Sequence, residues 1–251
     1  MRTARIALVT GAAQGLGRAI AERLAKDGCT VLVADIRHDD ARNAARDISA
    51  TGQRSMPLAL DVSDETSVSS AYAEIAEHFG RLDILVNNAG IAGQRAPVEL
   101  MPLAAWEKTL RVNLTGVFLM SRGAIPLMRS NGWGRIVNMS SLTARGQPGL
   151  NRSNYTATKA GIIGLSRLLA DEVGRDGITV NCIAPGRIMT ALTRQAGGDS
   201  KEYFERGATM TALGRLGEPE DIAHAVSWLC SDRAGSITGG ILDINGGAAM
   251  I

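Results

Sequence analysis

The stretch Ile6-Ala-Leu-Val-Thr-Gly-Ala-Ala-Gln-Gly-Leu-Gly17 joins a short apolar run to three glycines, and a helical pattern follows it. Glycine permits a sharp turn and lets backbone N–H groups approach a ligand closely. The N-terminus of the following helix adds unpaired donors and the positive end of the helix dipole, which suit a pyrophosphate. Three glycines are a weak signal in a chain that has 29, and the spacing of Gly11, Gly15 and Gly17 is not G-x-G-x-x-G. Their place between a strand and a helix nevertheless predicts a dinucleotide-binding turn.

The rest of the chain repeats this alternation of short apolar runs and longer helical patterns. Continuous apolar strands separated by helices are typical of a parallel sheet covered on both faces. We find no internal repeat, low-complexity tract or proline-rich linker, so we expect a single α/β domain over residues 1–251. The expected strands are Ile6–Thr10, Thr30–Asp35, Ser55–Leu60, Ile84–Asn87, Arg135–Met139, Thr179–Ile183 and Gly240–Ile244, and the expected helices include Leu16–Asp27, Glu65–Phe79, Ala105–Met128 and Tyr155–Val173.

The least regular stretch is Gly186–Gly217, which contains many polar residues. One interpretation is an ordinary surface loop. In a fold with a ligand crevice, an excursion of this kind also favours a lid over the substrate site, and we expect that role for it.

Composition argues against several classes of function. Hydrophobic residues make up 45% and charged residues 21% of the 251, as in globular rather than disordered proteins. The net charge of +2, without a basic run, argues against a nucleic-acid partner. Three cysteines and three histidines are too scattered for a disulfide framework or a metal site. The apolar runs are too short for a signal peptide or a membrane span, so we expect a cytoplasmic protein without a membrane partner.

The second expected strand ends at Asp35, 18 residues after Gly17. In dinucleotide-binding folds an acid at this place accepts hydrogen bonds from the adenosine ribose, and it would repel a 2′-phosphate. Gln14 brings no positive charge for such a phosphate. The alternative is that Asp35 merely begins a polar turn, and Arg37 leaves dual use of the two cofactors open. The pattern favours NAD over NADP.

The motif Tyr155-Thr-Ala-Thr-Lys159 lies in a helical pattern, and its spacing puts the two side chains on one helix face. An ammonium near a phenol stabilises the phenolate and lowers its pKa, which would make Tyr155 a general acid/base. The alternative is an ordinary solvated pair of residues on a helix.

The segment Arg135-Ile-Val-Asn-Met-Ser-Ser141 is an expected strand that ends in two serines. The carboxyl ends of strands line the ligand crevice of an open α/β sheet, so these hydroxyls should face the ligand. For either serine, a buried hydrogen bond to the backbone is the alternative.

With these residues in place, the chain resembles the short-chain dehydrogenase/reductase family over essentially its whole length. The resemblance implies a Rossmann fold, whose doubly wound parallel sheet has seven strands in the order 3-2-1-4-5-6-7 with helices on both faces. The matching motifs are Thr10–Gly17, Asp61-Val62, Asn87-Asn-Ala-Gly90, Asn113 within Arg-Val-Asn-Leu, the serines after the fifth strand, Tyr155 with Lys159, Pro185-Gly186 with Thr190, and Asp243-Ile-Asn-Gly-Gly247.

The resemblance also implies roles. Tyr155 would exchange the proton with the substrate oxygen, Lys159 would lower its pKa and hold the nicotinamide ribose, and Asn113 would hold a water. Ser141 matches the serine that orients the substrate; Ser140 is the alternative, because the loop to Tyr155 is one residue longer than is common in the family. The expected catalytic residues are therefore Asn113, Ser141, Tyr155 and Lys159, and the expected cofactor contacts are Gly11, Gln14, Gly15, Leu16, Gly17, Asp35, Asp61, Val62, Asn87, Ala89, Gly90, Tyr155, Lys159, Pro185, Gly186, Ile188 and Thr190.

The implied activity is NAD-dependent hydride transfer between a secondary alcohol and a ketone. The polar loop Arg145–Asn154, with Gln147, Asn151 and Arg152 as candidate donors, favours a polyol, sugar or hydroxy-acid derivative. Two alternatives stay open: an NADP-dependent 3-oxoacyl-(acyl-carrier-protein) reductase, and a non-enzymatic protein that kept the fold.

Two segments are apolar around most of their helical circumference, namely Ala157–Ala170 and Val112–Met128. A helix that covers a sheet needs only one apolar stripe, so the excess indicates a second buried face. Members of the family often form tetramers through these two helices. We therefore expect a homotetramer.

Overall fold

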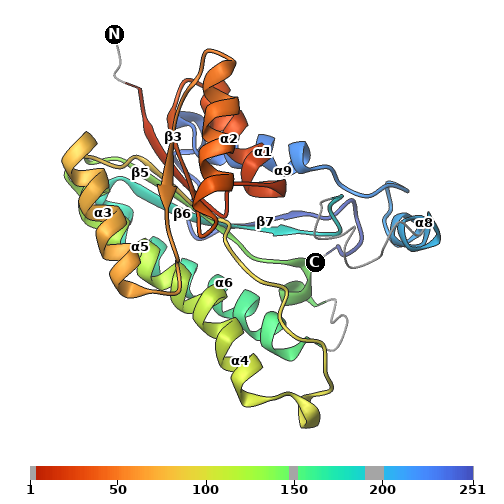
Figure 1. The fold of residues 1–251 in the computed structure, drawn as a ribbon. Helices are drawn as coiled ribbons and strands as arrows, with labels where there is room; N and C mark the ends of the chain where they lie inside the picture. The colour runs from red at the N-terminus through yellow and green to blue at the C-terminus, as the bar shows by residue number, and fades with distance from the viewer. Residues whose placement is uncertain (1–3, 147–151, 190–200, 251) are drawn as a thin grey trace.

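Seven parallel strands form one sheet in the order β3-β2-β1-β4-β5-β6-β7 (Figure 1). The computed structural model describes residues 4–146, 152–189 and 201–250. The observed order is the one that the sequence resemblance implied, so this prediction is confirmed. The strands are β1 (Ile6–Thr10), β2 (Thr30–Asp35), β3 (Arg54–Ala59), β4 (Ile84–Asn87), β5 (Gly134–Met139), β6 (Ile178–Pro185) and β7 (Ile241–Ile244).

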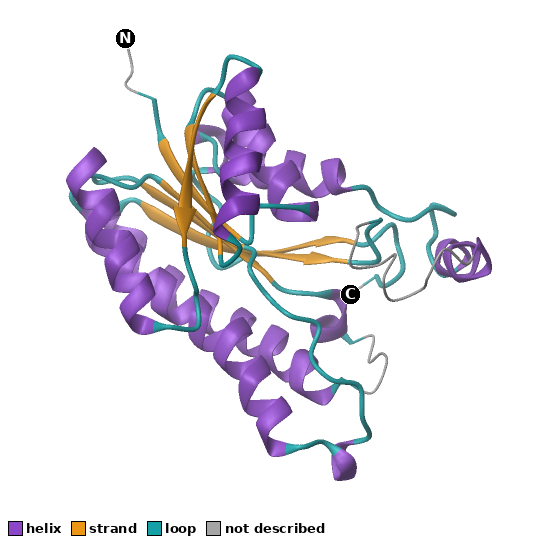
Figure 2. Cartoon of the chain, viewed as in Figure 1, coloured by secondary structure: helices purple, strands orange, loops and turns teal. Residues whose placement is uncertain are grey.

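Helices cover both faces of the sheet, as Figures 1 and 2 show. The first face carries α1 (Gly15–Lys26), α2 (His38–Ala50) and α9 (Pro219–Leu229). The opposite face carries α3 (Glu65–Phe79), α5 (Gly116–Arg129) and α6 (Ser153–Val173), and α4 (Leu103–Leu110) extends beyond the sheet beside α6. The helix α8 (Lys201–Thr209) stands apart from both layers.

Alternate residues of the central strands supply two hydrophobic cores. In β1, Ala7 and Val9 pack with α1, α2 and α9, whereas Ile6 and Leu8 pack with α3, α5 and α6. All five residues of β1 are buried. Because both faces are covered, a central strand must be apolar throughout, which is the pattern that predicted these strands.

The segment Ala105–Met128, expected as a single helix, is divided in the structure. It contains the end of α4, a π-helical turn η2 (Arg111–Thr115), and most of α5. A π turn adds one residue to a helical turn, and such turns are frequent at functional sites. The hydrophobic pattern continues across the insertion, so it could not reveal the break.

The sequence pattern also did not single out α2. Its buried residues are Ala41, Ala44, Ala45 and Ile48, and the rest of the helix is polar, so the segment has few large apolar side chains to mark it in the sequence. The expected limits of β1, β2 and β4 match the observed ones, and those of the other four strands differ by one or two residues.

Three further observations concern membrane spans, metal sites and disulfides. Over the described ranges, no helix is both long and apolar enough to cross a bilayer. In the same part of the chain, no group of three or more His, Cys, Asp or Glu side chains is arranged to hold a metal ion. Cys29, Cys182 and Cys230 are buried free thiols.

The topology predicts a ligand site at the carboxyl edge of the sheet. From β1 the chain proceeds outward through β2 to β3, and it then returns to the other side of β1 to form β4. Ligands of open α/β sheets bind at such a reversal of strand order. The turns after β1, β2, β4, β5 and β6 all open toward this edge.

Candidate active site

The turn after β1 is shaped to leave room at the N-terminus of α1. Gly15 has φ +55° and an added Cβ there would meet nothing within 4 Å. At Gly17, in contrast, a Cβ would lie 2.2 Å from the carbonyl oxygen of Gly11, so the helix can approach the turn only without a side chain. None of the described side chains caps α1 at Gln14, and no acid stands in its first turn. The open turn and its unused N–H donors fit a pyrophosphate.

The same turn is tied to the end of β4. The hydroxyl oxygen of Thr10 accepts hydrogen bonds from the backbone N–H groups of Asn88 and Ala89, both at 3.0 Å. The amide nitrogen of Asn88 donates to the carbonyl oxygens of Thr10 (2.9 Å) and Gly11 (3.1 Å). Asn88 lies within a motif that the sequence flagged, yet it was not expected as a functional residue.

Asp35 closes the turn from the side of β2. Its carboxylate is 7% exposed and accepts from the backbone N–H of Ala13 (3.2 Å) and of Arg37 (3.0 Å). The Arg37 guanidinium lies 3.6 Å from Asp35 and 3.0 Å from Asp40, between two carboxylates. The structure therefore brings Asp35 to the glycine turn, and it draws Arg37 toward acids of the protein.

Three other expected cofactor residues make mainly internal contacts. The carboxylate of Asp61 accepts from the N–H (2.9 Å) and hydroxyl (2.7 Å) of Ser63, which shapes the turn after β3. The amide nitrogen of Asn87 donates to Asn138 at 2.8 Å, inside the sheet. Val62 packs against Gly116, where a Cβ would come within 3.0 Å of it.

The residues after β6 border the same edge. Gly186 donates its N–H to the carbonyl of Ile244 at 2.9 Å, and Ile188 pairs with Gly217 through an isolated bridge. Thr190 lies outside the described residues. Pro185 ends β6.

Lys159 is buried at the end of β5. Its Nζ donates to the carbonyl oxygen of Met139 at 2.6 Å, and the side chain is almost inaccessible. Burial lowers the pKa of Lys159 to about 8. An added Cβ at Gly90 would lie 3.8 Å from this Nζ, so the absence of a side chain at Gly90 opens the approach to the ammonium.

Tyr155 lies one helical turn before Lys159, and the ammonium is 5.6 Å from the centroid of its ring. Burial raises the pKa of the Tyr155 phenol, while the Ser141 hydroxyl and the positive charge of Arg152 oppose that rise. The Lys159 ammonium itself donates to the Met139 carbonyl. That Lys159 lowers the pKa of this phenol stays a prediction.

The two serines after β5 have different surroundings. The Ser140 hydroxyl donates to the backbone carbonyl of Lys159 at 2.9 Å, which is the buried structural bond considered for either serine. The Ser141 oxygen accepts from the N–H of Thr143 at 3.3 Å and faces the phenol of Tyr155. Of the two, Ser141 is the one beside Tyr155.

Asn113 sits in the π turn and is completely buried. Its side-chain oxygen accepts from the N–H of Ile91 at 2.8 Å, and its amide nitrogen donates to the carbonyl of Ile91 at 2.9 Å. An added Cβ at Gly90 would be 3.2 Å from the Asn113 oxygen. Asn113 therefore holds the chain that passes Lys159.

Asn154 is a buried positioning residue that sequence reasoning missed. Its oxygen accepts from the N–H of Tyr155 at 2.8 Å, and its nitrogen donates to the Thr109 hydroxyl at 3.1 Å. It thereby fixes the start of α6 to α4. An asparagine at the start of a helix is a recognisable signal, although it does not by itself indicate a site.

The loop expected to contact substrate is described only in part. Gln147 and Asn151 lie outside the described residues. Arg145 makes a bidentate pair with Asp243, with nitrogen–oxygen distances of 3.1 and 3.0 Å. Arg152 has a buried Nε without a hydrogen-bond partner among the described residues.

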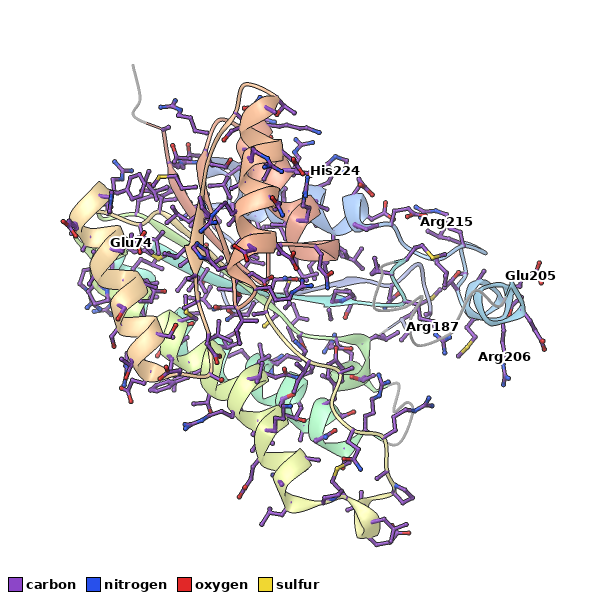
Figure 3. The ribbon with its side chains drawn as sticks, in the orientation of Figure 1. Glu74, Arg187, Glu205, Arg206, Arg215 and His224 are labelled. Atoms are coloured by element: carbon purple, nitrogen blue, oxygen red, sulfur yellow. The ribbon has the colours of Figure 1, made fainter. Side chains whose placement is uncertain are left out.

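The expected lid contains a helix. Figure 3 shows Arg187, from the loop after β6, beside α8, which carries Glu205 and Arg206. Gly207 packs closely on Leu216, since a Cβ there would lie 3.0 Å from its side chain. The segment 201–217 is thus partly helical, rather than a simple surface loop.

Together these groups can perform proton transfer at the carboxyl edge of the sheet. A phenol, a hydroxyl and an ammonium lie at the ends of β5 and the start of α6, next to a turn that fits a pyrophosphate. Such a set can give a proton to, or take it from, an oxygen of a bound molecule.

Comparisons with known proteins extend over nearly the whole chain. A family model described as enoyl-(acyl carrier protein) reductase matches residues 11–249. A 3-oxoacyl-(acyl-carrier-protein) reductase of Aquifex aeolicus (strain VF5) is 39% identical over 97% of this chain and 96% of its own length. A cis-4-hydroxycyclohexanecarboxylate dehydrogenase of Sinomonas cyclohexanicum is 42% identical over 98% of this chain and 97% of its own. A crystal structure assigned as a gluconate dehydrogenase of Agrobacterium tumefaciens superposes with a TM-score of 0.93 at 33% identity, covering 98% of this chain and 97% of that one.

Proposed function

Since the chain belongs to the short-chain dehydrogenase/reductase family and is an oxidoreductase of alcohol and ketone groups, we propose that it uses NAD and that Tyr155 exchanges the proton with the substrate. The observation that carries this proposal is the placement of Tyr155, Ser141 and Lys159 together beside the open glycine turn. Side chains suited to proton transfer thereby lie next to a site suited to a dinucleotide.

The chemistry divides between cofactor and protein. A bound nicotinamide would accept hydride from an alcohol or give hydride to a ketone. The Tyr155 phenol donates its proton to the substrate oxygen in reduction and receives it back in oxidation. Ser141 orients that oxygen by a hydrogen bond, and the Lys159 ammonium binds the ribose hydroxyls near the phenol. Asn113 keeps the backbone beside Lys159 in place.

The cofactor would lie along the carboxyl edge, held by residues of five turns. The N-terminus of α1 would hold its pyrophosphate, Asp35 would hold its adenosine ribose, and Asp61 and Val62 would border its adenine. The proposed contacts are Gly11, Gln14, Gly15, Leu16 and Gly17 in the first turn, Asn87, Ala89 and Gly90 after β4, and Pro185, Gly186, Ile188 and Thr190 after β6.

The preference for NAD rests on Asp35 and on the position of Arg37. A carboxylate accepts hydrogen bonds from ribose hydroxyls, and hydrogen bonds to charged groups contribute about 1.5–3 kcal/mol. A 2′-phosphate would face this carboxylate at short range. Arg37 would have to leave Asp35 and Asp40 to pair with the phosphate. We therefore expect a preference of at least about a hundredfold for NAD in kcat/KM, since about 1.4 kcal/mol corresponds to a factor of ten.

Replacement of Asp35 by Ser tests whether this residue determines the preference for NAD over NADP. Asp35→Ser removes the ribose acceptor and releases Arg37, so kcat/KM with NAD should fall and kcat/KM with NADP should rise. Asp40→Ser is the matched control, because it also loosens Arg37 but leaves the Asp35 carboxylate. Steady-state kinetics with both cofactors measure the ratio. A wild-type enzyme that used NADPH as well as NADH, or an unchanged ratio in Asp35→Ser, would contradict the assignment.

Replacement of Tyr155 by Phe tests the proton transfer. Tyr155→Phe removes the phenolic hydroxyl and keeps the ring, so turnover of an alcohol panel at 340 nm should fall by about 10²–10⁴-fold or more. NADH binding, followed by fluorescence, should persist. Tyr72→Phe is the control for loss of a hydroxyl, since the Tyr72 hydroxyl bonds only to the Met120 carbonyl in the described core. Near-normal turnover by Tyr155→Phe would exclude the mechanism.

The two candidate enzymatic functions differ in their substrate. The names of the relatives include a hydroxy-acid dehydrogenase and a 3-oxoacyl-(acyl-carrier-protein) reductase, at similar identity. Asp35 favours the first candidate, a dehydrogenase of polyols, sugars or hydroxy acids that uses NAD. The second would be an NADP-dependent reductase of acyl thioesters. Activity restricted to acyl thioesters with NADPH would select the second.

Self-association is proposed through α5 and α6. Phe118 on α5 is 45% exposed and Leu168 on α6 is 56% exposed, and a Cβ added at Gly164 would meet open space. These positions allow another helix to approach closely, so we propose a homotetramer. Light scattering at micromolar concentration should give a tetramer mass, and Phe118→Glu with Leu168→Glu should reduce it. A monomer mass for the wild type would refute the proposal.

A further inference from the structure

Arg152 differs from the other arginines near the site in having a buried donor without an acceptor. Its Nε is buried and has no hydrogen-bond partner in the described part of the chain. Arg145, on the same loop, is paired with Asp243 through two of its nitrogens, and Arg37 lies between two carboxylates. A buried guanidinium nitrogen is normally paired, so the environment of Arg152 is incomplete as it stands.

The electrostatic potential around Arg152 is positive for two reasons, its own charge and its place at the start of a helix. It is the N-cap residue of the 21-residue helix α6, and no acid stands in the first turn. The helix dipole presents its positive end here, so a cation at this position is unfavourable unless an anion joins it. Its backbone is fixed to the chain before α4 by a bridge to Ala96. The unpaired Nε of Arg152 and the N-terminus of α6 would therefore both favour an anion as ligand.

Arg152 also belongs to the reacting region. It is the N-cap of the helix that carries Tyr155, three residues before the tyrosine. The two groups are close enough for the guanidinium charge to act on the phenol. An anion bound to Arg152 would therefore lie near the oxygen that Tyr155 protonates.

We propose that Arg152 binds a carboxylate of the substrate, so that the enzyme oxidises hydroxy acids and reduces the corresponding oxo acids. This inference rests on the proposed function. A guanidinium matches a carboxylate in charge and planar geometry. A carboxylate is preferred to a phosphate because Arg145, the other arginine of this loop with described contacts, is already paired with Asp243.

The carboxylate takes no part in the bond changes. In oxidation, the carbinol carbon would give hydride to a bound nicotinamide, the hydroxyl proton would pass to the Tyr155 phenolate, and the C–O bond would become a carbonyl. The carboxylate stays ionised on Arg152 throughout. Arg152 is thus a specificity-determining residue that holds one end of the substrate while Tyr155 acts on the other.

The test compares hydroxy acids with their neutral carboxamides. A series with increasing separation between carbinol and carboxylate is assayed with NAD on the wild type, Arg152→Gln and Arg152→Lys. The wild type should prefer the best acid to its amide at least tenfold. Arg152→Gln should lower kcat/KM for the acid by about ten- to a hundredfold, mainly through KM, and should leave the amide nearly unchanged. Arg152→Lys should retain part of the preference. The acid/amide ratio cancels any effect of the lost charge on Tyr155 itself.

Arg129→Gln is the matched control for net charge, since Arg129 pairs with Asp176 at the far end of α5. It should leave the acid/amide ratio unchanged. A wild type that did not prefer the acid, or a ratio that Arg152→Gln left intact, would overturn the inference even if alcohols were turned over with NAD.

Binding to the inactive Tyr155→Phe variant separates this inference from the proposed function. Calorimetry with the same acid and amide in the presence of NADH should show tighter binding of the acid. The difference should vanish in the double variant Tyr155→Phe with Arg152→Gln. Retained acid binding without any alcohol turnover in the wild type would refute the proposed function and support the anchor. Equal binding of acid and amide would refute the anchor.

Discussion

The buried ammonium of Lys159 is the constraint around which the site is arranged. A charged group inside a protein needs an acceptor, and the Met139 carbonyl at the end of β5 supplies it at 2.6 Å. Ser140 binds the backbone carbonyl of the same lysine, so β5 and α6 are joined on both sides. This junction leaves Ser141 as the next residue along and brings it to Tyr155. Burial lowers the pKa of Lys159 to about 8, yet the group still carries its proton at neutral pH.

A second set of polar contacts connects this junction to the glycine turn. Four hydrogen bonds that involve the side chains of Thr10 and Asn88 join the end of β1 to the end of β4. Asn113 then forms two hydrogen bonds with the backbone of Ile91. At the preceding residue, Gly90, a side chain would crowd both Asn113 and Lys159. Ligand recognition and proton transfer are therefore held together by buried side-chain bonds to backbone, and both open at the point where the strand order reverses.

Patterns in the sequence predicted the strands and the helix after Gly17, because both faces of the sheet are covered and continuous apolar runs are then required. The strand order came from resemblance to a family, since periodicity contains no information on which strands are neighbours. The π turn at Asn113 was missed because one inserted residue does not interrupt an apolar pattern. The pairing of Arg145 with Asp243 and the burial that raises the Tyr155 pKa depend on contacts between distant segments, which no local motif records.

The site depends on Lys159 being buried as an ammonium, because its burial lowers the pKa of this group toward neutral pH. The chain has four lysines, so an NMR titration of protein labelled with ¹³C-lysine can follow each one, with Lys159→Met identifying its signal. In cofactor-free protein the Lys159 signal should titrate with a midpoint near pH 8, because burial lowers its pKa to about 8. A midpoint at about 10.4, the ordinary value for a solvated lysine, would contradict the account.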